Sequence, residues 1–349
     1  MNRLERTLSL VAIPSVSRSE SAIATEVERS LRDNPALDVE RVGDNVVART
    51  TGLHATRLLV AGHLDTVPGD ASRAVLEAGR VTGLGACDMK GSLAVMLELA
   101  DQRTPRPIEV TWVFYAREEI SRAESGLSEV AELRPDLLRA DAAVLAEPTG
   151  GAVEAGCQGT LRALVTVRGR RAHTARPFTG RNAIHRLVPL LARVSEYQPR
   201  EVVIDGVTFT EQLQAVAVEG GVAPNVVPDV AVCSLNHRVA PDRSRVEAAA
   251  WLRDFLSDAL DEGDTLEVVD WAPPAAPSMD NQRLADLARR TGQAVRAKVG
   301  WTDVATFAEL GIAATNYGAG DPLLAHRSDE FVSADELDEF ARVMGEWLG

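Results

Sequence analysis

Histidine and acidic side chains follow several apolar stretches of this 349-residue chain. The candidates for chemistry are His63, Asp65, Asp88, Glu118, Glu119, Glu147 and His326. Imidazole and carboxylate groups without a thiolate cluster suit a hard or borderline divalent cation; zinc fits best, with cobalt or manganese as alternatives. One His-x-Asp pair or one Glu-Glu pair is weak evidence, because each is also common in turns and on solvated surfaces. Their shared position after apolar runs indicates a metal site.

The elements that must position these groups are buried strands. Residues 57–62, 109–116, 141–146 and 312–317 are continuous apolar or β-prone runs, which are typical of strands covered on both faces. In open α/β sheets, ligands bind at the carboxyl ends of the strands. We therefore expect the side chains that follow these runs to meet at one edge of a sheet.

Asp88 differs from the other candidates because it precedes a helix, predicted over residues 92–100. One interpretation is that it only caps this helix. The glycines at 83, 85 and 91 favour the other interpretation, since glycine permits close approach of the backbone to a bound ion.

Five candidate ligands exceed what one four-coordinate ion uses while keeping an open position. Two ions that share a carboxylate would use all five, with Asp88 as the candidate bridge. Asp65 would orient the imidazole of His63 by accepting its ring N–H. One of the two adjacent glutamates would stay free as a general base. Such an assembly hydrolyses amides, because the metals lower the pKa of water and polarise the carbonyl.

The bulk properties exclude several other classes of protein. A net charge of −14 argues against a nucleic-acid or anionic-membrane surface. No apolar run reaches eighteen residues and the first residues are polar, so we expect a cytoplasmic protein. Three widely separated cysteines predict no disulfide framework. The sequence contains no Gly-x-Ser-x-Gly motif, which disfavours serine hydrolysis.

The middle of the chain has a different pattern. Residues 159–270 follow the order strand, helix, strand, strand, helix, strand, which predicts a ferredoxin-like α+β insert. The Pro-rich stretch 271–277 would be the return hinge. Residues 1–158 and 271–349 would then form one discontinuous α/β domain.

Five short motifs resemble the dinuclear zinc aminoacylase and carboxypeptidase family. They are Gly62-His63-Leu64-Asp65-Thr66-Val67-Pro68, Cys87-Asp88-Met89-Lys90-Gly91, Glu118-Glu119, Glu147-Pro148-Thr149 and Ala325-His326. The resemblance spans nearly the whole chain in order. It implies a mixed-sheet α/β/α metallopeptidase-like catalytic domain and makes the insert a lid and dimerisation domain.

The resemblance also implies a role for each residue. His63 and Glu147 would bind one zinc, Glu119 and His326 the other, and Asp88 would bridge them. Glu118 would be the general base and acid, while Asp65 would orient His63. In a homodimer, His173 would reach the tetrahedral oxyanion of the partner's site. The substrate-binding positions would be Asn225, Arg238 and Gly318.

Within the family, the likeness is closest to bacterial succinyl-diaminopimelate desuccinylases. The stretches that carry it are 154–160, 171–176, 225–228, 300–305 and 318–326. It implies removal of succinate from N-succinyl-LL-2,6-diaminopimelate, in lysine and diaminopimelate synthesis. The alternatives are a deacylase of another N-acyl amino acid, such as acetylornithine, a glutamate carboxypeptidase, or a non-catalytic binding protein with the same fold.

Overall fold

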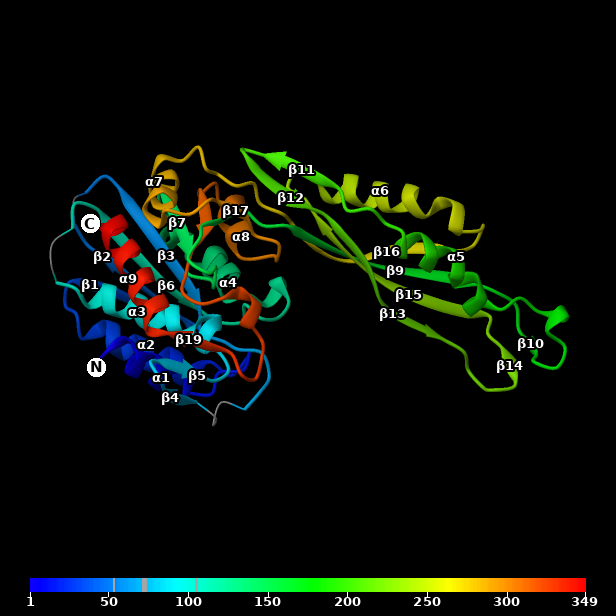
Figure 1. Ribbon diagram of the computed structural model, residues 1–349, viewed down its shortest axis with the longest axis horizontal. Helices are drawn as coiled ribbons and strands as arrows, with labels where there is room; N and C mark the ends of the chain where they lie inside the picture. Colours follow the sequence, from blue (N-terminus) through cyan, green and yellow to red (C-terminus); the bar gives the residue numbers. More distant parts are fainter. Residues whose placement is uncertain (53, 71–73, 104–105) are drawn as a thin grey trace. The chain divides into compact units, whose positions relative to one another are not determined.

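The computed structural model describes residues 1–52, 54–70, 74–103 and 106–349, and the chain divides into two compact units (Figure 1). The first unit comprises Met1–Gly156, Pro277–Ala297 and Thr302–Gly349. The second comprises Cys157–Ala276 and Lys298–Trp301. The first unit therefore draws on both ends of the chain, which Figure 1 colours blue to cyan and orange to red.

An eight-stranded mixed sheet forms the centre of the first unit, in the order β1-β2-β6-β3-β7-β18-β8-β17. Its strands are β1 Leu37–Val42, β2 Asn45–Thr50, β3 Arg57–His63, β6 Glu109–Tyr115, β7 Ala142–Leu145, β8 Glu154–Ala155, β17 Arg296–Ala297 and β18 Ala314–Asn316. Strands β6, β3, β7 and β18 run parallel to one another. Their carboxyl ends therefore share one edge, and the expected mixed-sheet α/β class is confirmed.

Helices cover this central sheet, and a small sheet packs beside α1 and α9. The helices are α1 Arg3–Val11, α2 Ser21–Arg32, α3 Gly91–Asp101, α4 Gly126–Leu133, α7 Gln282–Thr291, α8 Val304–Glu309 and α9 Ala334–Leu348. The small sheet pairs β19 Phe331–Ser333, β5 Arg80–Thr82 and β4 Val75–Glu77. Every residue from Leu58 to His63 in β3 is buried, so both faces of the sheet are covered. Helix α3 is buried almost all round, which explains its nearly unbroken apolar sequence.

The second unit contains a four-stranded antiparallel sheet in the order β13-β15-β9-β16. Its elements are β9 Gly159–Arg168, α5 Ala183–Ser195, β13 Gln212–Gly220, β15 Val230–Val239, α6 Arg245–Leu256 and β16 Thr265–Ala272. Buried residues alternate with half-buried or exposed ones along β9 and with half-buried ones along β15, because one face packs on the helices and the other does not. This order of strands and helices is the ferredoxin-like arrangement expected from the sequence.

Two further pairs of strands in the second unit were not predicted. One pairs β11 Glu201–Ile204 with β12 Val207–Thr210, and the other pairs β10 Ala172–His173 with β14 Val226–Val227. Among the described residues, no helix is long and apolar enough to cross a bilayer.

The division into units differs from the predicted boundaries on the return side. Strand β16 continues to Ala272, which pairs with Thr160, and Cys157 forms a further bridge with Ala275. Residues 271–276 therefore belong to the second unit instead of forming a free hinge. Residues 298–301 also join it, and the indole N–H of Trp301 donates to the carbonyl of Pro273 at 3.1 Å.

Candidate metal centre

Side chains from several strand ends meet at the carboxyl edge of the parallel strands. His63 is the last residue of β3, while Glu118 and Glu119 follow β6 and Glu147 follows β7. Ligand atoms of His63, Asp88 and Glu119 all lie within 4.8 Å of one another. The convergence predicted from the four apolar runs is therefore found in the first unit.

Asp88 lies between two imidazole rings. Its Oδ1 is 3.0 Å from Nε2 of His63, and its Oδ2 is 3.6 Å from Nε2 of His326. Nε2 of His63 is also 4.0 Å from Oε1 of Glu147, while Nε2 of His326 is 3.0 Å from Oε2 of Glu119. The five groups thus form two pairs, one on each side of the Asp88 carboxylate.

A tight turn places Asp88 in this position. Residues Ala86–Lys90 form an irregular turn directly before α3, with non-helical backbone angles at Asp88 and Met89 and a cis peptide bond between them. Gly85 starts the turn at φ 82°, in the left-handed region that glycine adopts without strain. The N-cap residue of α3 is Lys90, and the Asp88 carboxylate instead faces the two histidines. The interpretation that Asp88 only caps the helix is therefore wrong.

Asp65 lies beside His63 and the glutamate pair. Nδ1 of His63 is 3.0 Å from the backbone carbonyl oxygen of Asp65 but 3.6 Å from its carboxylate. The carboxylate instead accepts the backbone N–H groups of Glu118 and Glu119, at 3.0 and 3.1 Å. An Nδ1–H donated to the carbonyl leaves the Nε2 lone pair of His63 directed toward Asp88. The main-chain carbonyl of Asp65 is thus the closer partner of the ring, while the carboxylate faces the same nitrogen at a longer distance and holds the glutamate turn.

The charges of the centre are unbalanced without a cation. Burial raises the pKa of Glu118 well above its usual range, and the nearby Glu147 and Glu119 carboxylates raise it further, against the opposing effect of His63. The hydrogen bond with Glu119 raises the pKa of His326 to about 9. Carboxylates gathered so closely, with two imidazole nitrogens between them, match the donor set of a divalent metal centre.

The remaining predicted residues lie in two places. Gly318 follows β18 in the first unit, and its N–H donates to Oγ1 of Thr149 at 3.3 Å. A Cβ at this position would be 2.1 Å from the carbonyl oxygen of Ala146, so only glycine fits beside the strand end that precedes Glu147. In the second unit, His173 is exposed on β10, and Thr174 donates its N–H to the backbone carbonyl of Asn225 at 3.1 Å.

Arg238 is also in the second unit, on β15. Its Nη1 donates to Oγ1 of Thr160 at 2.6 Å. Burial lowers the pKa of this guanidinium from its usual value. His173 and Asn225 therefore share one pair of loops, whereas Arg238 lies on the sheet.

Two buried groups beside the centre were missed by sequence reasoning. The ring of Tyr115, at the end of β6, meets the ring of His63 edge-on with centroids 6.4 Å apart. Glu330 accepts the backbone N–H of Gly85, and burial raises its pKa to about 8. Tyr115 could have been found from its place just before Glu118, but nothing around Glu330 in the sequence distinguishes it from a surface acid.

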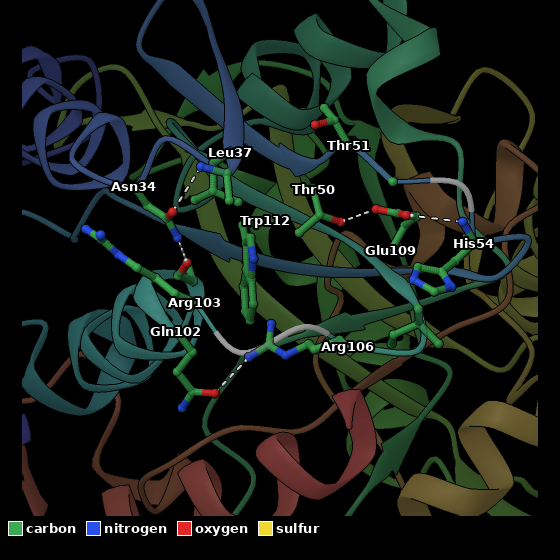
Figure 2. Close-up of a pocket in the computed structure, with 14 residues that line it drawn as sticks. Asn34, Leu37, Thr50, Thr51, His54, Gln102, Arg103, Arg106, Glu109 and Trp112 are labelled. Atoms are coloured by element: carbon green, nitrogen blue, oxygen red, sulfur yellow. Dashed lines mark hydrogen bonds between the residues drawn. The ribbon is translucent and has the colours of Figure 1, made fainter.

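A separate cavity of about 270 Å³ lies at the other end of β6. Figure 2 shows Trp112 in its centre, with Glu109 bound to Thr50 and to the backbone N–H of His54. Glu109 is the first residue of β6, whereas the glutamate pair follows the last. The cavity contains none of the residues predicted to bind metal or substrate.

Comparisons with known proteins agree with this geometry. Residues 59–349 match the sequence model of "Peptidase family M20/M25/M40". The chain is 45% identical over 348 residues to a putative succinyl-diaminopimelate desuccinylase DapE of Mycobacterium tuberculosis, covering 99% of this chain and 98% of that protein. It is 42% identical over 351 residues to the succinyl-diaminopimelate desuccinylase of Corynebacterium glutamicum, covering 98% and 95%.

Solved structures share the fold. The aminopeptidase PepT of Bacillus cereus superposes with a TM-score of 0.79 at 19% identity, covering 100% of this chain and 98% of that one. The YXEP protein of Bacillus subtilis, described as a dinuclear metal-binding peptidase, superposes with a TM-score of 0.70 at 17% identity, covering 99% and 96%. With the sequence match and the clustered ligands, these findings show that the chain belongs to peptidase family M20/M25/M40.

Proposed function

We propose that this protein is a dizinc amide hydrolase that removes succinate from N-succinyl-LL-2,6-diaminopimelate. The observation that carries the proposal is the position of Asp88, whose two carboxylate oxygens face two different histidines. One carboxylate shared by two ligand pairs is the arrangement that a two-metal site requires. The site belongs to a chain whose relatives at 42–45% identity are named as desuccinylases.

The five ligands divide as the distances suggest. His63 and Glu147 would hold one ion, Glu119 and His326 would hold the other, and Asp88 lies between the two pairs. Nitrogen and oxygen donors suit zinc, with cobalt as a substitute. When bound, the ions lower the pKa of a water molecule and polarise the scissile carbonyl.

Glu118 is the general base and acid in this proposal. Its backbone N–H is held by Asp65, next to Glu119, and its buried carboxyl group interacts electrostatically with Glu147 and His63. Burial and the neighbouring carboxylates raise its pKa, which favours a group that must accept a proton and release it again. Glu118 takes the proton of the attacking water and passes it to the leaving amine.

The second unit supplies the lid and the dimer contact, and the discontinuous first unit is the catalytic domain. Nδ1 of His173 accepts the N–H of Ala175 at 3.0 Å, so a neutral ring carries its proton on Nε2. That N–H donates to the oxyanion formed during amide cleavage, in the site of the partner subunit. Asn225, Arg238 and Gly318 bind the substrate, with Arg238 recognising a carboxylate.

We further propose that the protein acts as a cytoplasmic homodimer on a small acyl amino acid. An alternative substrate is another N-acyl amino acid, because the acetylornithine deacetylase of Myxococcus xanthus is 28% identical over 313 residues, covering 86% of this chain and 81% of that protein. The higher identity to the desuccinylases favours the succinyl substrate.

A side-by-side assay tests this function. The zinc-loaded protein is given N-succinyl-diaminopimelate, N-acetylornithine and a folate-type glutamate conjugate, and kcat/KM is measured for each. The proposal expects the succinyl substrate to have the highest kcat/KM. A higher value for either competitor would reassign the substrate, and bound zinc without turnover of any of the three would favour a binding protein.

A further inference from the structure

The segment between α1 and α2 is tied to the loop that follows β3. Val16 forms a parallel bridge with Thr66, and the hydroxyl of Ser15 donates to the carbonyl of Leu64 at 2.8 Å. The N–H of Ser17 donates to Thr66 at 3.2 Å. This segment contributes no metal ligand in the proposed function, yet its backbone runs along the loop that carries Asp65.

Ser17 contacts the side chain of Asp65 directly. Its hydroxyl donates to Oδ2 of Asp65 at 2.7 Å. Oδ1 and Oδ2 of the same carboxylate accept the N–H groups of Glu118 and Glu119 at 3.0 and 3.1 Å. One carboxylate therefore joins the N-terminal segment to the glutamate pair, and the hydroxyl of Ser17 holds that carboxylate in place.

Glu20 binds the backbone of Arg117, the residue directly before the Glu118–Glu119 pair. Glu20 is the N-cap residue of α2, but within the described chain its side chain makes no capping hydrogen bond. Oε1 of Glu20 instead accepts the N–H of Arg18 and that of Arg117, both at 3.0 Å. Glu20 is buried, and its pKa is raised mainly by that burial.

The backbone at Arg117 needs such support. Its φ is 61°, in the left-handed region that costs a non-glycine residue about 1 kcal/mol or more. This conformation turns the chain sharply between the end of β6 and the glutamate pair. A bond that fixes the N–H of Arg117 therefore fixes the direction in which the next two residues leave the strand.

We propose that Ser17 and Glu20 are positioning residues for the Glu118–Glu119 pair. Glu20 and Asp65 accept three consecutive backbone N–H groups, those of Arg117, Glu118 and Glu119, and the hydroxyl of Ser17 holds the Asp65 carboxylate. This inference rests on the proposed function, in which Glu119 ligates metal and Glu118 remains free. The three bonds explain how the two neighbouring side chains are held in these different roles. Both acceptors are carboxylates, and hydrogen bonds to charged acceptors are the stronger kind.

Burying Glu20 and Asp65 is costly for stability alone. A buried carboxylate loses its hydration, and well-packed apolar residues would fill the same space at lower cost. What the two buried carboxylates provide is precise geometry, since a general base must be placed to within a fraction of an ångström. The clamp formed by Ser17, Glu20 and Asp65 provides that precision from outside the ligand set.

The experiment compares hydroxyl and carboxyl deletions with conservative replacements. Ser17→Ala removes the bond to Asp65, and Ser17→Thr keeps a hydroxyl. Glu20→Ala removes the acceptor for Arg117, and Glu20→Gln keeps an oxygen at that position. The matched control is Ser19→Ala, because Ser19 is exposed in the same segment and its hydroxyl has no hydrogen-bond partner among the described residues.

Two quantities are measured on full-length protein that has kept its thermal midpoint. The first is kcat and KM at saturating zinc, and the second is the affinity for each zinc ion by chelator competition. Loss of an outer contact to a metal site costs about 10–100-fold in activity or affinity. We expect Ser17→Ala and Glu20→Ala to lower kcat about tenfold at unchanged KM, and to weaken one of the two zinc affinities about tenfold.

Both conservative variants and the Ser19→Ala control should stay near wild type. Unchanged kcat and zinc affinity in Ser17→Ala would overturn the proposal, as would an equal loss in Ser17→Thr. A protein that binds two zinc ions but cleaves no acyl amino acid would instead overturn the proposed function. In that case the zinc affinities of Ser17→Ala and Glu20→Ala still show whether the clamp positions Glu119, because a weakened affinity supports the clamp and an unchanged one contradicts it.

Discussion

Glu118 is the residue whose replacement separates catalysis from stability most clearly. Glu118→Gln keeps the length and volume of the side chain and removes its ability to take a proton. The backbone N–H that binds Asp65 is untouched, and the five proposed ligands remain. The substitution therefore tests the chemistry of one carboxyl group.

The expected loss of activity is large. A positioned general acid or base contributes about 10²–10⁴-fold, and Glu118 serves both proton transfers, so kcat should fall about 10³-fold. This corresponds to about 4 kcal/mol of transition-state stabilisation, at 1.36 kcal/mol for each factor of ten. Zinc content and KM should not change, because Glu118 is not a ligand.

In the metal-free protein, Glu118→Gln should increase stability although it abolishes most of the activity. Burial, Glu147 and Glu119 raise the pKa of Glu118 above its value in the unfolded chain, so ionisation of this group opposes folding. The destabilisation is absent below the unfolded pKa of about 4.3 and grows as pH rises toward the folded pKa. After zinc is removed, the glutamine variant should therefore be more stable than wild type at about pH 8, and the difference should vanish in acid.

The assay combines kcat at saturating zinc, zinc per chain and thermal midpoints in the presence of chelator at acidic and alkaline pH. Glu132→Gln is the matched control, because Glu132 is exposed on α4. Activity within tenfold of wild type would refute the role of Glu118 as the base. A metal-free variant less stable than wild type at alkaline pH would refute the electrostatic argument.

Three further predictions concern the ligand set, the strand end and the second unit. In the metal-free protein the pKa of His326 is raised to about 9, so zinc must displace a proton from this ring. The apparent zinc affinity, measured by chelator competition, should therefore rise between about pH 6.5 and 9 and then level. A zinc affinity that does not change with pH would contradict this. Gly318→Ala should destabilise the protein by about 1–3 kcal/mol in denaturant unfolding, because a Cβ there would be 2.5 Å from the carbonyl oxygen of Glu147; wild-type stability would show that the backbone adjusts freely. His173→Ala should lower kcat about 10²-fold with both zinc ions retained, and unchanged kcat would remove this histidine from the reaction.

Much of the centre could be predicted because continuous apolar runs in the sequence indicate which strands are buried. Continuous apolar runs identified β3, β6 and β7, and parallel strands bring their carboxyl ends to one edge. The residues that follow those runs were therefore expected to lie close together at that edge. The glycines around Asp88 favoured close approach of the backbone to a bound ion, and the structure places Asp88 in an irregular turn that starts at Gly85.

The supporting contacts could not be predicted in the same way. Ser17 and Asp65 are 48 residues apart, and Glu20 and Arg117 are 97 apart, so no local pattern joins them. A polar residue directly before a helix, as Glu20 is before α2, would be expected from local sequence to cap that helix. Tertiary context instead uses its carboxylate for the backbone of another segment.

The most direct test of a dinuclear centre is anomalous diffraction from crystals of the zinc-loaded protein. The account predicts two zinc peaks per chain, about 3.5–4 Å apart, on either side of the Asp88 carboxylate. His63 should bind one ion and His326 the other, with the Glu118 carboxylate bound to neither. A single peak, or a zinc ion ligated by Glu118, would contradict it.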